Sequence, residues 1–217
     1  VIHTIRQEEN KLLASIFLES DTSKKEAILQ SFIQLRKYRA EKETNIIKQE
    51  FLSETIEGMA EYAGCMALKQ LSPDQVIQNN INILAEPAPF FFDIRKMSYY
   101  TGSMLCLALS ETDTSFYHEI GKQSLSLFEL ISKEVPPKYT SIQPSPILIR
   151  MLEESHRQKE EILSSFLHTN PNYTSMQTSI CGYDPMNMWK LDDYLFCSHF
   201  VLLEPPNSSI LVMRSAA

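Results

Sequence analysis

Four glutamates recur along one stretch of the chain, at a spacing that could bring their carboxylates together. They are Glu50, Glu54, Glu57 and Glu61, at positions i, i+4, i+7 and i+11. At 3.6 residues per turn, this spacing places all four on one face of a helix. Like charges so arranged repel one another by roughly a few tenths of a kcal/mol per pair. We therefore expect a cation opposite this face, for example a metal ion. The alternative is a solvated acidic face on an ordinary amphipathic helix.

The same stretch contains Gly58 and Gly64, two of the chain's five glycines. A glycine inside a helix costs about 0.5–1 kcal/mol relative to alanine, so two of them need a compensating interaction. Very close packing against another element would provide it. A metal ion held at such a close contact would explain the glycines and the glutamates together.

Composition excludes several functional classes. The chain has 217 residues, of which 43% are hydrophobic, and a formal net charge of −7. The acidic balance argues against nucleic acid as a partner, and the lack of an apolar run of about 18 residues argues against a membrane span. The four cysteines lie far apart in the sequence, which favours reduced thiols in a cytoplasmic protein.

Periodicity predicts a mainly α fold (α+β), with a multi-helix body and a small C-terminal antiparallel β-sheet. Residues 1–170 are expected to form the helical domain, and residues 171–217 a small β subdomain. The predicted helices cover residues 1–18, 24–42, 44–71, 73–84, 94–110, 114–134 and 146–168. The predicted strands cover residues 176–181, 191–203 and 209–213.

A basic cluster closes the second predicted helix. Its members are Arg36, Lys37, Arg39 and Lys42, which we place mostly outside the apolar face of that helix. This cluster is either a solvated flank or a partner for the acidic helix.

One segment of the acidic helix resembles a known motif. Glu57-Gly-Met-Ala-Glu-Tyr62 resembles the Glu-Gly-x-Ala-x-Tyr segment of zinc metallopeptidases of the gluzincin type. In that group a helix bearing His-Glu-x-x-His supplies two zinc ligands and the catalytic base, and a glutamate on a later helix supplies the third ligand. The resemblance implies that Glu57 is this third ligand and that zinc is the cofactor.

The N-terminus resembles the end of the His-Glu-x-x-His motif. Val1-Ile-His3 matches its last three positions, which implies that His3 is the second histidine ligand and that Glu54 or Glu61 orients it. The first histidine and the catalytic glutamate would then lie directly before Val1, outside this chain. The implied peptidase site is incomplete, and we expect this chain alone to be inactive. The alternative for His3 is an ordinary histidine at a helix end.

A third resemblance lies in Tyr99-Tyr-Thr-Gly102, which is similar to a Tyr-x-x-Gly segment of aminopeptidase-like gluzincins. It implies that the Tyr99 hydroxyl is the oxyanion donor, with Tyr100 as the alternative. The competing interpretation is that both tyrosines pack a central helix beside a glycine at a helix contact.

Arg95 has two interpretations: it orients the substrate, or it pairs with Asp93 or Glu61. Taken together, the resemblances imply a zinc-dependent peptidase-like protein acting on peptides. The competing function is a non-catalytic helical interaction domain, whose acidic face docks a basic partner or faces water. The sequence carries no signal for an oligomeric state.

Overall fold

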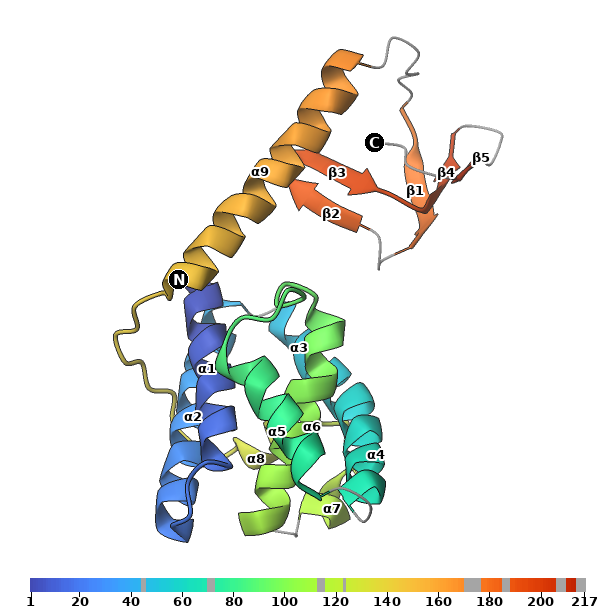
Figure 1. Ribbon diagram of the computed structural model, residues 1–217. Coiled ribbons are helices and arrows are strands. Elements are labelled where there is room, and N and C mark those ends of the chain that lie inside the picture. The colour runs from blue at the N-terminus through green and yellow to red at the C-terminus, as the bar shows by residue number, and fades with distance from the viewer. Residues whose placement is uncertain are drawn as a thin grey trace. The chain divides into compact units, whose positions relative to one another are not determined.

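The computed structural model describes residues 1–43, 46–69, 73–112, 116–122, 124–169, 177–184, 188–205 and 210–213. It is mainly helical with a small antiparallel β region near the C-terminus, which confirms the predicted fold class (Figure 1). The chain divides into two compact units, Val1–Leu148 and Ile149–Ala217. Among the described residues, none of the helices has both the length and the apolar character that crossing a membrane requires.

The first unit is a layered helical body (Figure 1). Its elements are α1 (Ile2–Ile16), α2 (Thr22–Lys42), α3 (Ile46–Ser53), η1 (Glu54–Gly58), α4 (Met59–Lys69), α5 (Pro73–Ala85), α6 (Ile94–Thr112), α7 (Phe116–Glu119) and α8 (Leu127–Ile131). Local sequence signals set several of the helix ends. At the start of α2, the carboxylate of Asp21 accepts a hydrogen bond from the Lys24 backbone N–H at 2.9 Å. A side-chain acceptor at this position satisfies a backbone donor that a helix N-terminus otherwise leaves unpaired.

Helix α6 is the central element of this unit. Met97, Met104, Leu105 and Cys106 are fully buried and belong to the main hydrophobic core. The core draws its other side chains from α1, α2, α3, α5 and α8. The elements that pack against the buried part of α6 share this hydrophobic core.

The predicted acidic helix is present, but it is not a uniform α-helix. The π-helical turn η1 separates α3 from α4 and covers Glu54–Gly58. Gly58 lies against Gly102 of α6: a β-carbon at residue 58 would stand 2.4 Å from the Gly102 α-carbon. The close packing predicted from the glycines is thus confirmed for Gly58. At Gly64, a β-carbon would meet nothing within 4 Å, so that part of the prediction is wrong.

The helix predicted for residues 114–134 is interrupted. The structure has α7 and α8 in its place, with Gly121 between them at a φ of +82°. This backbone conformation favours glycine and ends a helix, which explains the break. Residues 113–115, where we predicted the helix to begin, lie outside the described part of the chain.

The second unit contains most of α9 (Pro146–Thr169) together with all the strands. Strands β1 (Ser179–Tyr183), β4 (Phe200–Glu204) and β5 (Ile210–Met213) form one antiparallel sheet in the order β1-β4-β5. Strands β2 (Met188–Leu191) and β3 (Tyr194–Cys197) form a separate antiparallel hairpin.

The division between the units lies at Leu148 and Ile149, not after residue 170 as predicted. The reason is that α9 packs on the β2–β3 hairpin. The rings of Phe166 and Phe196 meet edge to face at 6.4 Å, and the Lys159 ammonium lies 6.0 Å from the Trp189 ring. The hydrophobic periodicity of the sequence predicted that α9 is helical, but it did not indicate to which unit α9 belongs.

Candidate functional site

The four predicted glutamates divide into two environments. Glu50 and Glu54 are 2% and 1% exposed, whereas Glu57 and Glu61 are only partly buried. The solvated acidic face is therefore wrong for the first two glutamates. The expectation of a cation opposite them is correct, and the cations are arginine side chains.

A buried ion-pair cluster surrounds Glu50 and Glu54. It consists of Arg6, Glu9, Arg36, Arg39, Glu50 and Glu54, each at most 4% exposed. Placing Arg36 and Arg39 in a solvated flank was wrong, and the alternative that they partner the acidic helix is confirmed. Buried charges persist in proteins when they are paired and hydrogen bonded, as they are here.

Arg39 joins three helices within the cluster. Its Nε and Nη2 donate to the two carboxylate oxygens of Glu9 on α1, at 2.8 and 2.7 Å. Its Nη1 and Nη2 donate to the two oxygens of Glu50 on α3, at 2.9 and 2.7 Å. A planar guanidinium suits such two-point contacts, and so fixes the spacing of α1, α2 and α3.

Arg36 makes the matching contacts one turn earlier. It donates from Nε to Glu9 at 3.0 Å and from Nη1 to Glu54 at 2.7 Å. The other Glu54 oxygen accepts a 2.6 Å hydrogen bond from the Thr101 hydroxyl on α6. We predicted that Glu54 or Glu61 would orient His3; the described contacts of Glu54 are with Arg36 and Thr101.

The cluster shifts the pKa values of the two buried glutamates in opposite directions. Burial raises the pKa of Glu50, but the nearby arginines, Arg39 foremost, outweigh burial and hold that pKa well below its usual range. For Glu54 burial prevails, and its pKa is raised despite the attraction of Arg36. Glu50 is therefore a firmly ionised anion, whereas Glu54 holds its proton more tightly than an exposed glutamate does.

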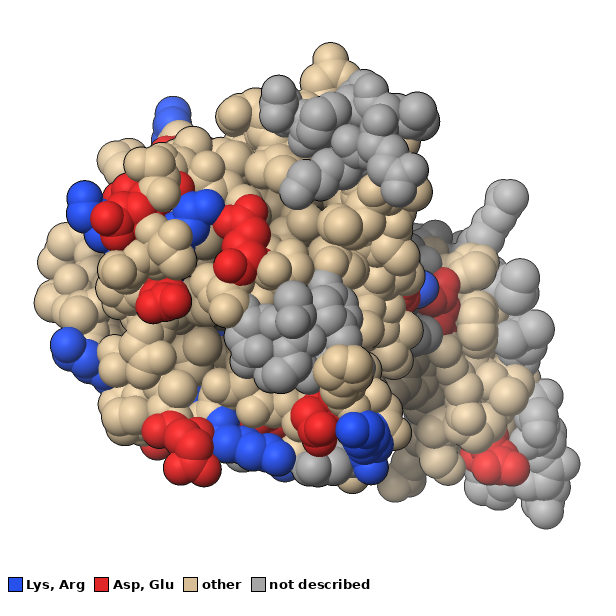
Figure 2. Space-filling model, turned by 90° about the horizontal axis from the view of Figure 1, so that it is seen from below, with Lys and Arg blue, Asp and Glu red and all other residues tan. Residues whose placement is uncertain are grey.

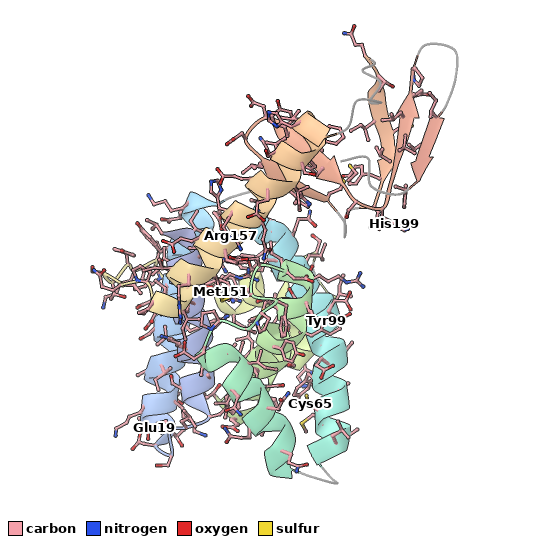
Figure 3. All side chains as sticks on the ribbon, turned by 45° about the horizontal axis from the view of Figure 1, so that its top comes forward. Glu19, Cys65, Tyr99, Met151, Arg157 and His199 are labelled. Carbon is pink, nitrogen blue, oxygen red and sulfur yellow. The ribbon has the colours of Figure 1, made fainter. Side chains whose placement is uncertain are left out.

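A second group of side chains lies on the next turn of the acidic helix, and we call it the Glu57 group: Glu57, Arg95 and Tyr99. Arg95 donates to one oxygen of Glu57, Oε1, from Nε at 2.9 Å and approaches it with Nη2 at 2.8 Å. The Tyr99 hydroxyl also hydrogen bonds to Glu57, which lowers the pKa of this carboxylate, as does Arg95, and raises the pKa of the tyrosine. Tyr99 projects from α6, as labelled in Figure 3.

The structure thus brings together three residues that the sequence singled out separately. Arg95 was predicted to orient substrate or to pair with Asp93 or Glu61, and its observed partner is Glu57. Asp93 caps α6 by accepting from the Lys96 backbone N–H at 2.9 Å. An oxygen of Glu61 lies 3.9 Å from the Cys65 sulfur, one turn along α4.

His3 lies on the first turn of α1 and is half-buried. Its ring meets those of Phe91 and Phe92 edge to face, at centroid distances of 6.3 and 5.1 Å. These phenylalanines directly precede α6, whose first turns carry Arg95 and Tyr99. His3 and Glu57 are therefore placed against the same segment, residues 91–99.

Arg6 connects this segment to the buried ion-pair cluster. Its Nη1 donates to the Phe91 backbone carbonyl at 2.9 Å, and its Nε lies 3.7 Å from Glu50. The guanidinium also stands 5.3 Å from the centre of the Phe91 ring. The cluster thereby fixes the position of the loop on which His3 packs.

The residues that the structure describes do not form a zinc site by themselves. A zinc site in a peptidase needs three protein ligands and an open position. Within the described ranges, no group of three or more His, Cys, Asp or Glu side chains is arranged to hold a metal ion. In addition, Oε1 of Glu57 is engaged by Arg95.

The visible surface carries mixed charge. On the face in Figure 2, acidic and basic side chains lie among one another, without a continuous patch of one sign. Lys25 and Glu111 form an ion pair with a distance of 2.7 Å between the Lys25 ammonium and a Glu111 oxygen.

A scan against protein-family models and searches of curated proteins and of solved structures find no match to this chain. What the chain does must therefore be inferred from its own geometry.

Proposed function

We propose that this chain is a gluzincin-like, zinc-dependent peptidase-like protein, in which Glu57 and His3 are metal ligands and peptides are the substrates. These two ligands are one short of the three protein ligands that a catalytic zinc site needs, and we expect no peptide hydrolysis from them alone. The observation that carries the proposal is the convergence of Arg95 and Tyr99 on the Glu57 carboxylate. Glu57 and Tyr99 belong to two separate motif resemblances on different helices, and their side chains are in contact.

Local backbone geometry also supports a functional role for Glu57. It lies in the π-helical turn η1, and such turns are rare and frequent at functional sites. The contact of Gly58 with Gly102 draws this turn against α6. Glu57 is thus held on rigid elements, as a ligand or binding residue needs to be.

Glu57, Tyr99 and His3 each have a role under this proposal. Glu57 supplies a carboxylate ligand, and the Tyr99 hydroxyl exchanges its hydrogen bond to Glu57 for one to the oxyanion that forms on a peptide carbonyl under attack. His3 supplies an imidazole from α1, from a position beside Phe91 and Phe92. All four described cysteines are free thiols, which supports a reducing, cytoplasmic setting.

A second candidate is a non-catalytic interaction domain. The sequence suggested that such a domain docks its partner on an acidic face. This version loses support because Glu50 and Glu54 are buried and paired with arginine. One observation still favours a contact surface on the acidic helix: Leu52 and Ile56, which lie four residues apart, are 50% and 61% exposed. Clustered exposed apolar side chains are typical of interaction surfaces.

The gene sequence offers the first test. If His3 is the second histidine of His-Glu-x-x-His, the two codons directly before that of Val1 encode His-Glu. Any other pair of residues at those positions removes the basis for His3 as a ligand.

Zinc content offers the second test, on a form of the protein that begins upstream of Val1 if the gene encodes His-Glu there. We expect Glu57→Gln to lower its zinc content about tenfold or more after dialysis, because an amide is a poor zinc ligand. The matched control is Glu154→Gln, since Glu154 is another carboxylate bound by an arginine, at 2.8 Å from Arg157. Equal zinc content in the wild type and both variants would refute the proposal.

A further inference from the structure

A pocket lies where α1, α2, α5 and α6 meet, at the end of the first unit that faces the viewer in Figure 2. Its volume is about 330 Å³. Glu111 in its lining and Arg95 of the Glu57 group are both on α6, about 24 Å apart along the helix. The pocket is therefore separate from the Glu57 group.

Much of the pocket lining is apolar. Phe17, Ile77 and Ile81 contribute to it. Ile81 belongs to the main hydrophobic core, and Phe17 and Ile77 pack against that core. Leu18 also lines the pocket and is 68% exposed. Small-molecule sites are typically hollows of roughly 300–1,000 Å³ with mostly apolar walls and a few polar groups. This pocket has that size and lining, and an apolar group that binds in it would leave water.

One cation and one anion line the same pocket, Lys25 of α2 and Glu111 of α6. Lys25 Nζ lies 2.7 Å from Glu111 Oε2, and the two side chains are 20% and 35% exposed. An ion pair that water can reach contributes little net stability, so a ligand can separate it. Glu111 also lies in the last turn of α6, which has no basic residue. The partial negative charge at a helix C-terminus favours a cation there.

We propose that this pocket binds a free α-amino acid with an apolar side chain, such as leucine or phenylalanine. The ammonium of the ligand pairs with Glu111, its carboxylate pairs with Lys25, and its side chain lies against the apolar lining. Such a ligand forms two ion pairs in place of the one that it separates. A simple amine or carboxylic acid would pair with only one of the two charges. The inference is independent of the proposed function, because it uses none of the residues assigned there.

The test measures the binding of L-leucine and L-phenylalanine to the purified chain by isothermal titration calorimetry. Lys25→Met and Glu111→Gln each remove one charge from the pocket. The matched control is Lys122→Met, which breaks a surface ion pair with Glu119, at 3.2 Å. Two further ligands separate the contributions: glycine has both charges without an apolar side chain, and N-acetyl-L-leucine amide has the side chain without the charges. Far-UV circular dichroism establishes that each variant is folded.

We expect Lys25→Met and Glu111→Gln each to weaken the binding of both apolar amino acids about tenfold or more, as the loss of a hydrogen bond to a charged group does. Lys122→Met should bind them as the wild type does. Glycine and N-acetyl-L-leucine amide should each bind the wild type at least about tenfold more weakly than L-leucine. L-Leucine should also raise the urea midpoint of the wild type, because it binds the folded state.

Three results would overturn the inference. The first is that neither L-leucine nor L-phenylalanine binds the wild type at millimolar concentration. The second is equal affinity in the wild type and both pocket variants, since the amino acid then binds elsewhere. The third is that N-acetyl-L-leucine amide binds as tightly as L-leucine, since the pocket then does not recognise the two charges. If one pocket variant does not fold, the other variant and the ligand series still decide.

Discussion

The buried ion-pair cluster and the Glu57 group use the same chemistry in two environments. In each, arginine donates hydrogen bonds shorter than 3.1 Å to a glutamate of the acidic helix, and Glu54 and Glu57 lie one helical turn apart. They differ in burial: Arg39 is 1% exposed, and the Arg95 side chain is 52% exposed. Burial removes water as a substitute partner, so a buried pair cannot be broken cheaply. An arginine–glutamate contact is therefore structural where it is buried in the cluster, and exchangeable where it is exposed in the Glu57 group.

The largest expected effect comes from removing one arginine of the cluster. Arg39→Met leaves the carboxylates of Glu9 and Glu50 buried without their main partner, and we expect a loss of about 3–5 kcal/mol in the free energy of unfolding. Urea denaturation gives this value from the midpoint and slope. The control Arg157→Met, at an exposed site, should leave the unfolding curve unchanged. A loss for Arg39→Met as small as that of the control would contradict a structural role for the cluster.

A smaller effect is expected at the contact between the acidic helix and α6. Gly58→Ala places a β-carbon 2.4 Å from the Gly102 α-carbon, and backbone must move to admit it, at a cost of about 1–3 kcal/mol. The matched variant in the same helix is Gly64→Ala, where the new methyl group meets nothing within 4 Å. It should stabilise the protein by about 0.5–1 kcal/mol. Effects of the same sign in the two variants would show that the Gly58 contact is not as described.

The pH dependence of stability should distinguish the two buried glutamates. Because the folded pKa of Glu50 is lowered, its contribution is complete above the unfolded value of about 4.3 and is lost as the pH falls below it. The folded pKa of Glu54 is raised, so its contribution is present at low pH and declines as the pH rises above about 4.3.

Glu50→Gln and Glu54→Gln test these opposite signs. The deficit of Glu50→Gln relative to the wild type should grow as the pH rises towards about 4.3, and then stay constant. The deficit of Glu54→Gln should instead shrink as the pH rises further. Urea unfolding at a series of pH values measures both, and parallel curves for the two variants would show that the two glutamates share one environment.

The smallest effect is expected at the Glu57 group. Glu57→Gln and Arg95→Ala each break an exposed pair, and both should leave the urea midpoint at the wild-type value. A clear loss of stability in either variant would mean that this pair is part of the framework, as the cluster is.

The sequence predicted the positions of the main helices and the cation opposite the acidic face, but not the identity of that cation. The sequence did contain a signal that arginines are this cation. Arg36 and Arg39 follow Phe32 and Leu35 at helical spacing, and so continue the buried stripe of α2. We interpreted Arg36 and Arg39 as surface residues because arginine is charged, and gave this more weight than their spacing from the buried residues. Glu9 likewise lies in phase between Ile5 and Leu13 on α1.

Other features could not be read from the sequence. The pairing of Arg95 with Glu57 depends on how α6 packs against η1, which is set by the contact between Gly58 and Gly102. Gly58 in the sequence indicates that another backbone comes close, but it does not identify Gly102 of α6 as the contact. The division of the chain at Leu148 depends on the packing of α9 against the β2–β3 hairpin, a long-range contact that local period does not encode.

Paired double-mutant cycles test most directly whether burial separates the two kinds of arginine–glutamate contact. One cycle combines Arg39→Met with Glu50→Gln, and the other combines Arg95→Ala with Glu57→Gln. We predict a coupling energy of about 1–3 kcal/mol for the buried pair and none above error for the exposed pair. Equal coupling in the two cycles would contradict the distinction between a structural and an exchangeable arginine.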